Sequence, residues 1–272
     1  MPNIRQQIQF AGISPTKSAG QNFLMSGQTL EKITATAQIK KTDTIVEIGS
    51  GPGNLTVHLA RHAKKVYAVE RDCRMIGILE KNTLKYDNVT IVNDDIFKWR
   101  NTHSELLPDG GYKIVANLPY YLTSRALREF LERLPKPSMM VFLLQKEVAE
   151  RMMSEPGQMN LLALSVQYYA DVEYLFDVDR TQFWPEPEID SAVVRLSKIQ
   201  PSGPEDKQMF RIARIAFAGK RKQLQNTLKN GLKVSTKEML AIFSELGLLG
   251  TVRPQELSVK NWVSLAEKLP IE

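Results

Sequence analysis

Residues 44–53 read Thr-Ile-Val-Glu-Ile-Gly-Ser-Gly-Pro-Gly, and this stretch decides the fold. Its first half is a short apolar run typical of a buried strand, and glycine ends the run. Residues 55–63 then carry apolar side chains at helical spacing. A strand, a glycine loop and a helix in this order predict the start of an α/β fold.

The same alternation continues along the chain. Further strand-like runs, each followed by a loop or a helix-compatible segment, occupy residues 65–70, 89–93, 113–116 and 139–144. Two more strands are expected at residues 168–177 and 192–196, separated by a proline-broken loop at residues 183–187. The alternation over residues 44–144 predicts a parallel sheet with helices on both faces, the Rossmann-like arrangement.

The start of the chain is less strongly patterned. Residues 1–20 are polar and show little periodicity. Leu30, Ile33 and Ala37 then recur at helical spacing, which predicts a first helix. Ser26 precedes this helix and is a natural N-cap for it.

Most of the net charge of +6 lies in the C-terminal part of the 272-residue chain. From residue 201 onward, 12 Lys and Arg stand against 7 Asp and Glu, so +5 of the +6 falls there. Four stretches of helical spacing predict a small all-helical domain at residues 201–272, following a larger domain at residues 1–200. A polyanionic partner would bind this basic domain, although composition alone favours a solvated basic helix surface.

Other features exclude several classes of protein. The single cysteine, Cys73, excludes an internal disulfide framework, and no stretch is long enough to span a bilayer. With no apolar signal segment at the N-terminus, we expect a soluble cytoplasmic protein, and we expect it to be a monomer. His58 and His62 lie four residues apart on a predicted helix, but no third ligand is apparent, so no metal site is expected.

Acidic residues follow the next two strands, at the edge of the sheet where the glycine loop lies. Gly49 and Gly51 let the backbone approach a nucleotide-like ligand. Glu70 closes the second strand, where a carboxylate can accept hydrogen bonds from both ribose hydroxyls. Asp94 and Asp95 end the third strand, placed to meet the exocyclic amine of the ligand's adenine. The glycine spacing does not fit the G-x-G-x-x-G dinucleotide fingerprint or the Walker pattern, and it favours S-adenosylmethionine over NAD.

The segment Asn117-Leu118-Pro119-Tyr120 follows the strand at residues 113–116. The N6 amine of adenine is a poor nucleophile because its lone pair is delocalised into the ring. The Asn117 side-chain oxygen and the Leu118 backbone carbonyl can accept the two N6 hydrogens, and Pro119 fixes the backbone that aims this carbonyl. Attack on a sulfonium methyl then needs mainly positioning and desolvation. The segment therefore predicts methyl transfer to adenine without a dedicated general base.

An adenine in folded RNA has to be extruded before its amine can reach a buried methyl donor. Extruded bases are held by stacking on aromatic faces. Tyr120 offers one face, and Phe183 is a candidate for the other, on a loop stiffened by Pro185 and Pro187. Considered within its loop alone, Phe183 is equally well explained as a packing residue at a strand end.

Together these residues resemble a known family, the bacterial KsgA-type 16S ribosomal RNA adenine dimethyltransferases. The similarity runs along nearly the whole chain. Besides the two motifs above, it rests on Gly20-Gln21-Asn22-Phe23-Leu24, Leu144-Gln145-Lys146-Glu147-Val148, Phe183-Trp184-Pro185-Glu186-Pro187, Asp190-Ser191-Ala192-Val193-Val194, Arg221-Lys222-Gln223-Leu224 and Arg253-Pro254-Gln255-Glu256-Leu257-Ser258.

The resemblance implies a class I methyltransferase fold and transfer of four methyl groups to two adjacent adenines near the 3′ end of small-subunit rRNA, in a pre-30S particle. It implies contacts to S-adenosylmethionine from Asn22, Leu24, Gly49, Glu70, Asp95 and Asn117. In this family Asn22 and Leu24 belong to an N-terminal segment that covers the cofactor. The C-terminal helical domain would bind rRNA, with Lys220-Arg221-Lys222 contacting phosphates.

Two segments depart from the family pattern. The family usually has Asp where Ser26 stands, and both residues can cap the helix. The segment Gln158-Met159-Asn160-Leu161-Leu162 replaces a common Tyr-Gly-Arg segment, so no RNA contact is assigned there.

Two alternative functions remain open at this point. The macrolide-resistance type of rRNA adenine methyltransferase shares the fold and a similar reaction motif but modifies large-subunit rRNA. The segment at residues 183–187 and the tail segments favour the small-subunit type. A non-catalytic assembly or transcription factor on the same scaffold is the other alternative, and the intact reaction motif argues against it.

Overall fold

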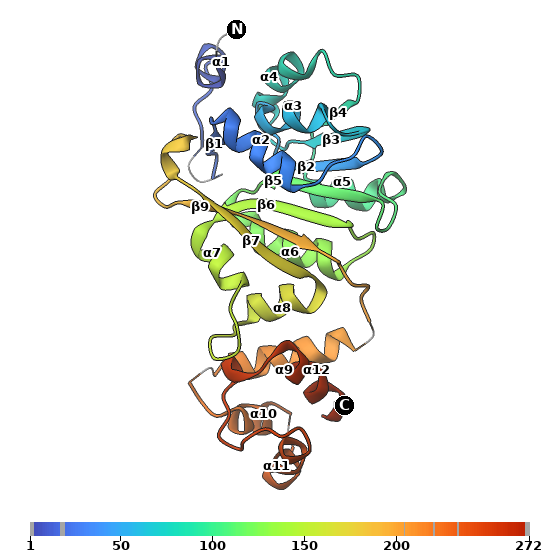
Figure 1. The fold of residues 1–272 in the computed structure, drawn as a ribbon, viewed down its shortest axis with the longest axis vertical. Coiled ribbons are helices and arrows are strands. Elements are labelled where there is room, and N and C mark those ends of the chain that lie inside the picture. Colours follow the sequence, from blue (N-terminus) through green and yellow to red (C-terminus); the bar gives the residue numbers. More distant parts are fainter. Residues whose placement is uncertain (1–2, 17–19, 204, 220, 233, 270–272) are drawn as a thin grey trace. The chain divides into compact units, whose positions relative to one another are not determined.

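The computed structural model describes residues 3–16, 20–203, 205–219, 221–232 and 234–269. The chain divides into two compact units, one of residues 1–149 and 171–199 and the other of residues 150–170 and 200–272 (Figure 1). Within the described residues, every helix is too short or too polar to cross a bilayer.

The first unit is built on a seven-stranded sheet with the strand order β4-β3-β2-β5-β6-β9-β7. The strands are β2 (Thr44–Ile48), β3 (Lys65–Val69), β4 (Val89–Val92), β5 (Tyr112–Asn117), β6 (Met139–Gln145), β7 (Asp171–Val178) and β9 (Ser191–Ser197). The predicted parallel pairing is confirmed from β4 to β6. Strands β7 and β9, for which the sequence indicated no direction, run antiparallel to each other, and β9 also runs antiparallel to β6.

Helices cover both faces of this sheet, as the alternation of strands and helices predicted (Figure 1). They are α2 (Gly27–Thr36), α3 (Asn54–Ala60), α4 (Cys73–Thr83), α5 (Ile96–Thr102), α6 (Thr123–Glu132) and α7 (Lys146–Met152), the last of which ends in the second unit. On one face, side chains of α2 and α3 such as Ile33 and Leu59 form a buried cluster with Ile45 and Val115. Burial of such side chains stabilises the unit by about 1.5–3 kcal/mol each.

The N-terminal region contains two elements that the sequence did not indicate. Helix α1 (Ile4–Phe10) begins at a capping box formed by Asn3 and Gln6, and Ile8 is its buried residue. Strand β1 (Phe23–Leu24) pairs antiparallel with β8 (Phe183–Trp184) in a separate two-stranded sheet. The predicted loop at residues 183–187 is therefore wrong for its first two residues, because the backbone of β1 supplies their hydrogen-bond partners.

The helix expected after Ser26 is confirmed as α2, although α1 precedes it in the chain. The Ser26 hydroxyl accepts a hydrogen bond from the Thr29 amide at 3.3 Å, as the capping prediction required. Leu30 and Ile33 are buried on its inner face, and Ala37 lies buried directly after the last helical residue. The N-cap and the apolar spacing were thus sufficient to locate this helix.

The second unit is helical. It contains α8 (Leu161–Tyr169), α9 (Asp206–Phe217), α10 (Leu224–Leu232), α11 (Thr236–Glu245) and α12 (Val259–Lys268). The hydroxyls of Tyr168 and Tyr169 donate to the Asp206 carboxylate at 2.6 and 2.8 Å, and both rings pack against Phe210. These contacts explain why residues 150–170 group with the C-terminal helices.

Two sequence-based boundaries differ from this grouping. A strand was expected from residue 168, but α8 extends to Tyr169 and β7 begins at Asp171, since both tyrosines are engaged by Asp206. The compact units also do not coincide with a division after residue 200, because residues 150–170 join the second unit. The assignment of cofactor binding to residues 1–200 and of rRNA binding to residues 201–272 stays a prediction.

Candidate active site

A pocket of ≈ 320 Å³ lies at the carboxyl ends of the parallel strands, and its lining comes from the first unit alone. Strand β2 has β3 on one side and β5 on the other, so the strand order reverses there, which is where open α/β sheets bind ligands. The lining includes residues of the loops after β2, β3, β4 and β5, together with Gly20–Phe23 and Phe183. Its volume falls in the range of about 300–1,000 Å³ found for small-molecule sites.

The loop after β2 requires glycine for steric reasons. Gly51 has φ 55°, and a Cβ atom there would lie 3.1 Å from the Phe23 ring. Gly53 has φ 94°, and its Cβ would lie 2.8 Å from Leu79 Cδ1, closer than real Cβ contacts allow. Gly49 and Gly51 both line the pocket, and neither has a side chain that would keep a ligand away from the backbone there; their contact with the cofactor stays a prediction.

Glu70 is held in place by the backbone that surrounds it. Its side chain is 8% exposed, and its two carboxylate oxygens accept hydrogen bonds from the Gly51 and Asp72 amides, both at 2.7 Å. Burial raises the pKa of this carboxyl above its ordinary value. Each carboxylate oxygen has two lone pairs, so both can still accept a ribose hydroxyl in the pocket.

Asp72 ties the N-terminal segment to the loop after β3. Its carboxylate accepts a hydrogen bond of 2.7 Å from the side-chain Nε2 of Gln21 and forms a salt bridge of 2.6 Å with Arg74. Hydrogen bonding from Arg74 is the main reason that the pKa of Asp72 falls to about 2. Sequence reasoning missed this residue, because nothing in the spacing connects Gln21 with a side chain fifty-one positions away.

Asp95 follows β4 and has two roles open to it. One oxygen, Oδ1, accepts hydrogen bonds from the Phe97 and Lys98 amides and caps α5. The other oxygen, Oδ2, has no hydrogen-bond partner among the described residues. Because Asp95 lines the pocket, Oδ2 is available to an adenine amine.

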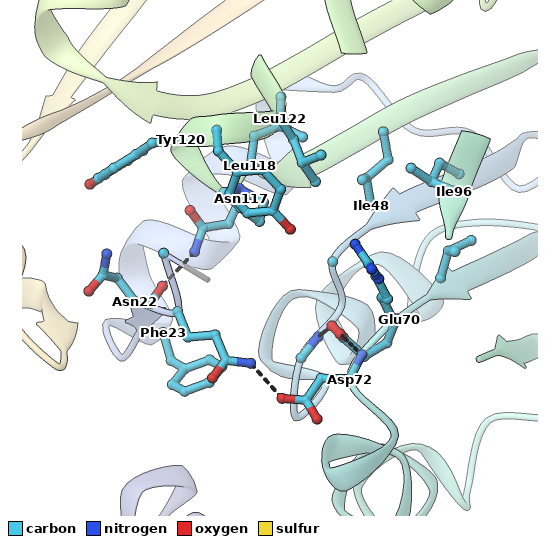
Figure 2. A pocket seen from close by; sticks show the side chains of 18 of the residues that line it. Asn22, Phe23, Ile48, Glu70, Asp72, Ile96, Asn117, Leu118, Tyr120 and Leu122 are labelled. Atoms are coloured by element: carbon cyan, nitrogen blue, oxygen red, sulfur yellow. Dashed lines mark hydrogen bonds between the residues drawn. The ribbon is translucent and has the colours of Figure 1, made fainter. Parts of the chain in front are cut away.

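Asn117 is anchored at one end of its carboxamide. Its Nδ2 donates to the Asn22 carbonyl at 2.9 Å, which turns Oδ1 away from that contact. Neither Asn117 Oδ1 nor the Leu118 carbonyl accepts a hydrogen bond from any described residue, while the Leu118 amide is bound to Leu143. Figure 2 shows Asn117 between Tyr120 and Asn22 on one side and Glu70 on the other. The two acceptors predicted for the N6 amine are thus both available.

The aromatic residues of the site differ in how far they are buried. Tyr120 is partly buried, and burial raises the pKa of its hydroxyl above the ordinary value. Phe183 lines the pocket but is only 5% exposed, because its ring packs in the core cluster and its backbone pairs with Leu24. Tyr121, to which the sequence analysis gave no role, also lines the pocket and is 57% exposed.

The remaining predicted residues are placed as follows. Asn22 lines the pocket, whereas Leu24 lies in the core cluster with 3% exposure, so its contact with the cofactor stays a prediction. Arg221 and Lys222 are exposed in the second unit before α10, and Lys220 lies outside the described residues. No cluster of three or more His, Cys, Asp or Glu side chains suited to a metal ion occurs in the described parts of the chain.

The donor set of the pocket fits S-adenosylmethionine. The Glu70 carboxylate can accept hydrogen bonds from the two ribose hydroxyls, and Asp95 Oδ2 can accept one from the adenine amine. The glycine loop allows the ligand to lie close to the backbone. Asn117 lies next to this half of the pocket, where a methyl group would be delivered to a second ligand (Figure 2).

Comparisons with known proteins point to one family. The ribosomal RNA adenine dimethylase family matches residues 14–270. A ribosomal RNA small subunit methyltransferase A of Dehalococcoides mccartyi is 38% identical over 269 residues, which cover 97% of this chain and 92% of the relative.

Two solved structures are also similar. A dimethyladenosine transferase from Plasmodium falciparum aligns with a TM-score of 0.77 and 28% identity, covering 89% of this chain and 95% of that one. The 23S rRNA methyltransferase ErmE aligns with a TM-score of 0.71 and 24% identity, covering 91% of this chain and 99% of that one. The likeness to ErmE is a likeness of fold.

Proposed function

The chain belongs to the ribosomal RNA adenine dimethylase family, and from this premise we propose that it dimethylates the N6 amines of two adjacent adenines near the 3′ end of small-subunit rRNA. The methyl donor is S-adenosylmethionine. The observation that carries the proposal is the anchored Asn117 carboxamide, which leaves two acceptors, Asn117 Oδ1 and the Leu118 carbonyl, at the pocket.

These two acceptors suit the chemistry of an adenine amine. S-adenosylmethionine supplies an electrophilic methyl group on a sulfonium sulfur. In the first transfer, hydrogen bonds from the two N6 hydrogens to Asn117 Oδ1 and the Leu118 carbonyl favour a more tetrahedral nitrogen, whose lone pair is then available for attack. The methylated nitrogen releases a proton, and in the second transfer the one remaining N6 hydrogen can bind either acceptor. The Asn22 carbonyl holds the amide in this orientation before the substrate arrives, so little reorganisation is needed at the moment of transfer.

The cofactor half of the pocket is supplied by strand-end residues. Glu70 is positioned by two backbone amides to accept the ribose hydroxyls, and Asp95 presents Oδ2 to the adenine amine. Gln21, bonded to Asp72, ties the N-terminal segment to this side of the pocket. The segment excludes water from the methyl donor, which strengthens every polar contact inside.

The proposed partner is small-subunit rRNA in an assembling pre-30S particle, bound by a monomer in the cytoplasm. Arg221 and Lys222 support this partner, because exposed cations on a basic helical domain can neutralise backbone phosphates. A large-subunit substrate is the second candidate, since ErmE shares the fold. The small-subunit assignment is favoured by relatives such as the Dehalococcoides mccartyi protein at 38% identity.

The proposal is tested by methylating purified ribosomal subunits with labelled S-adenosylmethionine. Small and large subunits, both from cells that lack this methylation, are incubated separately with the full-length protein. We expect label in small-subunit rRNA, released as N6,N6-dimethyladenosine on digestion. Label confined to the large subunit would overturn the assignment, and absence of label from both would overturn the activity.

A further inference from the structure

Tyr121 is an aromatic residue at the pocket that the reaction described above does not use. It lies in the 3₁₀ turn Tyr120–Leu122, directly after the reaction motif. The turn is closed by hydrogen bonds from the Leu122 amide to the Pro119 carbonyl and from the Thr123 amide to the Tyr120 carbonyl. The backbone that carries the Tyr121 ring is therefore held in a defined conformation.

The exposure of Tyr121 sets it apart from other residues of the site. Its side chain is 57% exposed and lines the pocket. The other exposed large hydrophobic side chains in the described residues, among them Phe10, Leu134 and Leu249, do not line it. The Tyr121 side chain also has no hydrogen bond and no ring contact with another aromatic residue in the described part of the chain.

The two aromatic residues assigned to the substrate from sequence have less free surface. Phe183 is 5% exposed and belongs to the core cluster, so little of its ring is open to a ligand. Tyr120 is partly buried, so less of its surface than that of Tyr121 is accessible. An extruded base needs an accessible aromatic or apolar face on which to stack. Tyr121 supplies the most accessible aromatic face of the pocket.

We propose that Tyr121 stacks on the target adenine and holds the purine ring so that its N6 amine reaches Asn117 and Leu118. This inference rests on the proposed function and deepens it by naming a residue that binds the substrate base. Stacking uses the π face and not the hydroxyl, so phenylalanine can replace Tyr121 and an aliphatic side chain cannot. A tyrosine also loses little rotational freedom on binding, because two torsion angles define its side chain.

The test compares Tyr121→Leu and Tyr121→Phe with the wild-type protein. For each, KM for small subunits and Kd for S-adenosylmethionine are measured separately. Alanine substitution of a stacking aromatic costs about 1–3 kcal/mol per base, so we expect Tyr121→Leu to raise KM on the order of tenfold. The Kd of Tyr121→Leu for S-adenosylmethionine should stay at the wild-type value, which would also show that this variant is folded. The KM of Tyr121→Phe for small subunits should equal that of the wild-type protein.

A matched control and a direct optical readout complete the experiment. Phe10→Leu removes another exposed aromatic ring, 79% exposed and away from the pocket lining, and should leave KM unchanged. With 2-aminopurine in place of the target adenine in a small-subunit RNA fragment, the wild-type protein and Tyr121→Phe should quench its fluorescence. Tyr121→Leu should leave it bright.

Several results would overturn the inference. Wild-type KM and quenching for Tyr121→Leu would show that the ring does not hold the base. A rise in Kd for S-adenosylmethionine that accounts for the whole loss would place the ring against the cofactor. These outcomes concern Tyr121 only if the wild-type protein methylates small subunits. If the proposed function itself fails, no label appears with the wild-type protein or with any variant.

Discussion

The nitrogen of the Asn117 carboxamide is hydrogen-bonded within the protein, whereas its oxygen is available to accept a hydrogen bond from the substrate. Nδ2 is bonded to the Asn22 carbonyl, ninety-five positions away in the sequence, while Oδ1 remains an open acceptor. The motif in the sequence indicated the acceptor, but it gave no sign of the partner that orients it. Contacts between distant loop residues leave no periodic pattern, which is also why the Gln21 bond to Asp72 was missed.

Replacing Asn117 by alanine removes both the acceptor and its anchor. We expect Asn117→Ala to lower kcat for methyl transfer by about 10²-fold, the usual cost of losing one preorganised polar group that acts on the reacting centre. Single-turnover methylation of small subunits measures this effect. Asn88→Ala is a matched control, because the Asn88 amide also donates to backbone carbonyls but lies outside the pocket lining. Wild-type rates for Asn117→Ala would disprove this account of the chemistry.

Glu47 gives a prediction about pH at the same scale. It is 2% exposed, next to Thr56, whose hydroxyl donates to it at 2.5 Å. Burial raises the pKa of Glu47 from its ordinary 4.5 to about 8 in the folded protein. Between these values the unfolded chain loses a proton that the folded chain keeps, so the free energy of unfolding falls with rising pH, by up to about 1.4 kcal/mol per pH unit.

The Glu47→Gln variant lacks this titrating group. We expect its free energy of unfolding, relative to wild type, to rise steadily as the pH is raised from 4.5 to about 8 and to level off above that. Urea unfolding of both proteins across this range measures the difference. If the difference in free energy of unfolding between the two proteins does not change with pH, Glu47 is ionised in the folded protein over this whole pH range.

At the scale of elements, strand ends were predictable and short elements were not. Regular alternation of strands and helices brings the ends of β2, β3, β4 and β5 to one edge, so Glu70, Asp95 and Asn117 could be assigned to one site. Helix α1 has a single buried side chain, and β1 and β8 have two residues each. Elements of this length carry too few apolar positions to show a period.

The glycine loop yields a prediction about stability. Gly53→Ala forces a side chain into a left-handed conformation and against Leu79, so we expect a loss of about 1–2 kcal/mol or more. Gly77 lies inside α4, and a Cβ there meets nothing within 4 Å. Gly77→Ala should therefore stabilise the protein by about 0.5–1 kcal/mol. Urea unfolding of the two variants measures both changes in the free energy of unfolding. Equal changes for Gly53→Ala and Gly77→Ala would contradict the steric requirement for glycine in the loop after β2.

At the scale of the whole molecule, the site lies in one unit and most of the net positive charge in the other. The sequence indicated a helical basic tail, but not that residues 150–170 belong with it. That grouping depends on Tyr168 and Tyr169 meeting Asp206, again a contact between distant residues. The described residues of the tail include the exposed Arg221 and Lys222, the candidates for phosphate binding.

Salt dependence tests this candidate surface. Each lost phosphate contact lowers the slope of log Kd against log salt concentration by about 1, so Arg221→Ala with Lys222→Ala should lower it by about 2. Filter binding of small-subunit rRNA over a salt series measures the slope. Lys81→Ala with Lys85→Ala removes two exposed cations of the first unit and serves as the control. An unchanged slope for the Arg221 and Lys222 variant would exclude these residues from the rRNA interface.

The central claim is dimethylation of adjacent adenines in small-subunit rRNA, and a mass-spectrometric map of rRNA tests it most directly. The map compares cells with and without the gene, and cells carrying the Asn117→Ala variant. The account predicts loss of N6,N6-dimethyladenosine at two neighbouring positions near the 3′ end of small-subunit rRNA, restored by the wild-type gene and not by the variant. Unchanged methylation at these positions, or loss at an adenine of the large subunit instead, would contradict it.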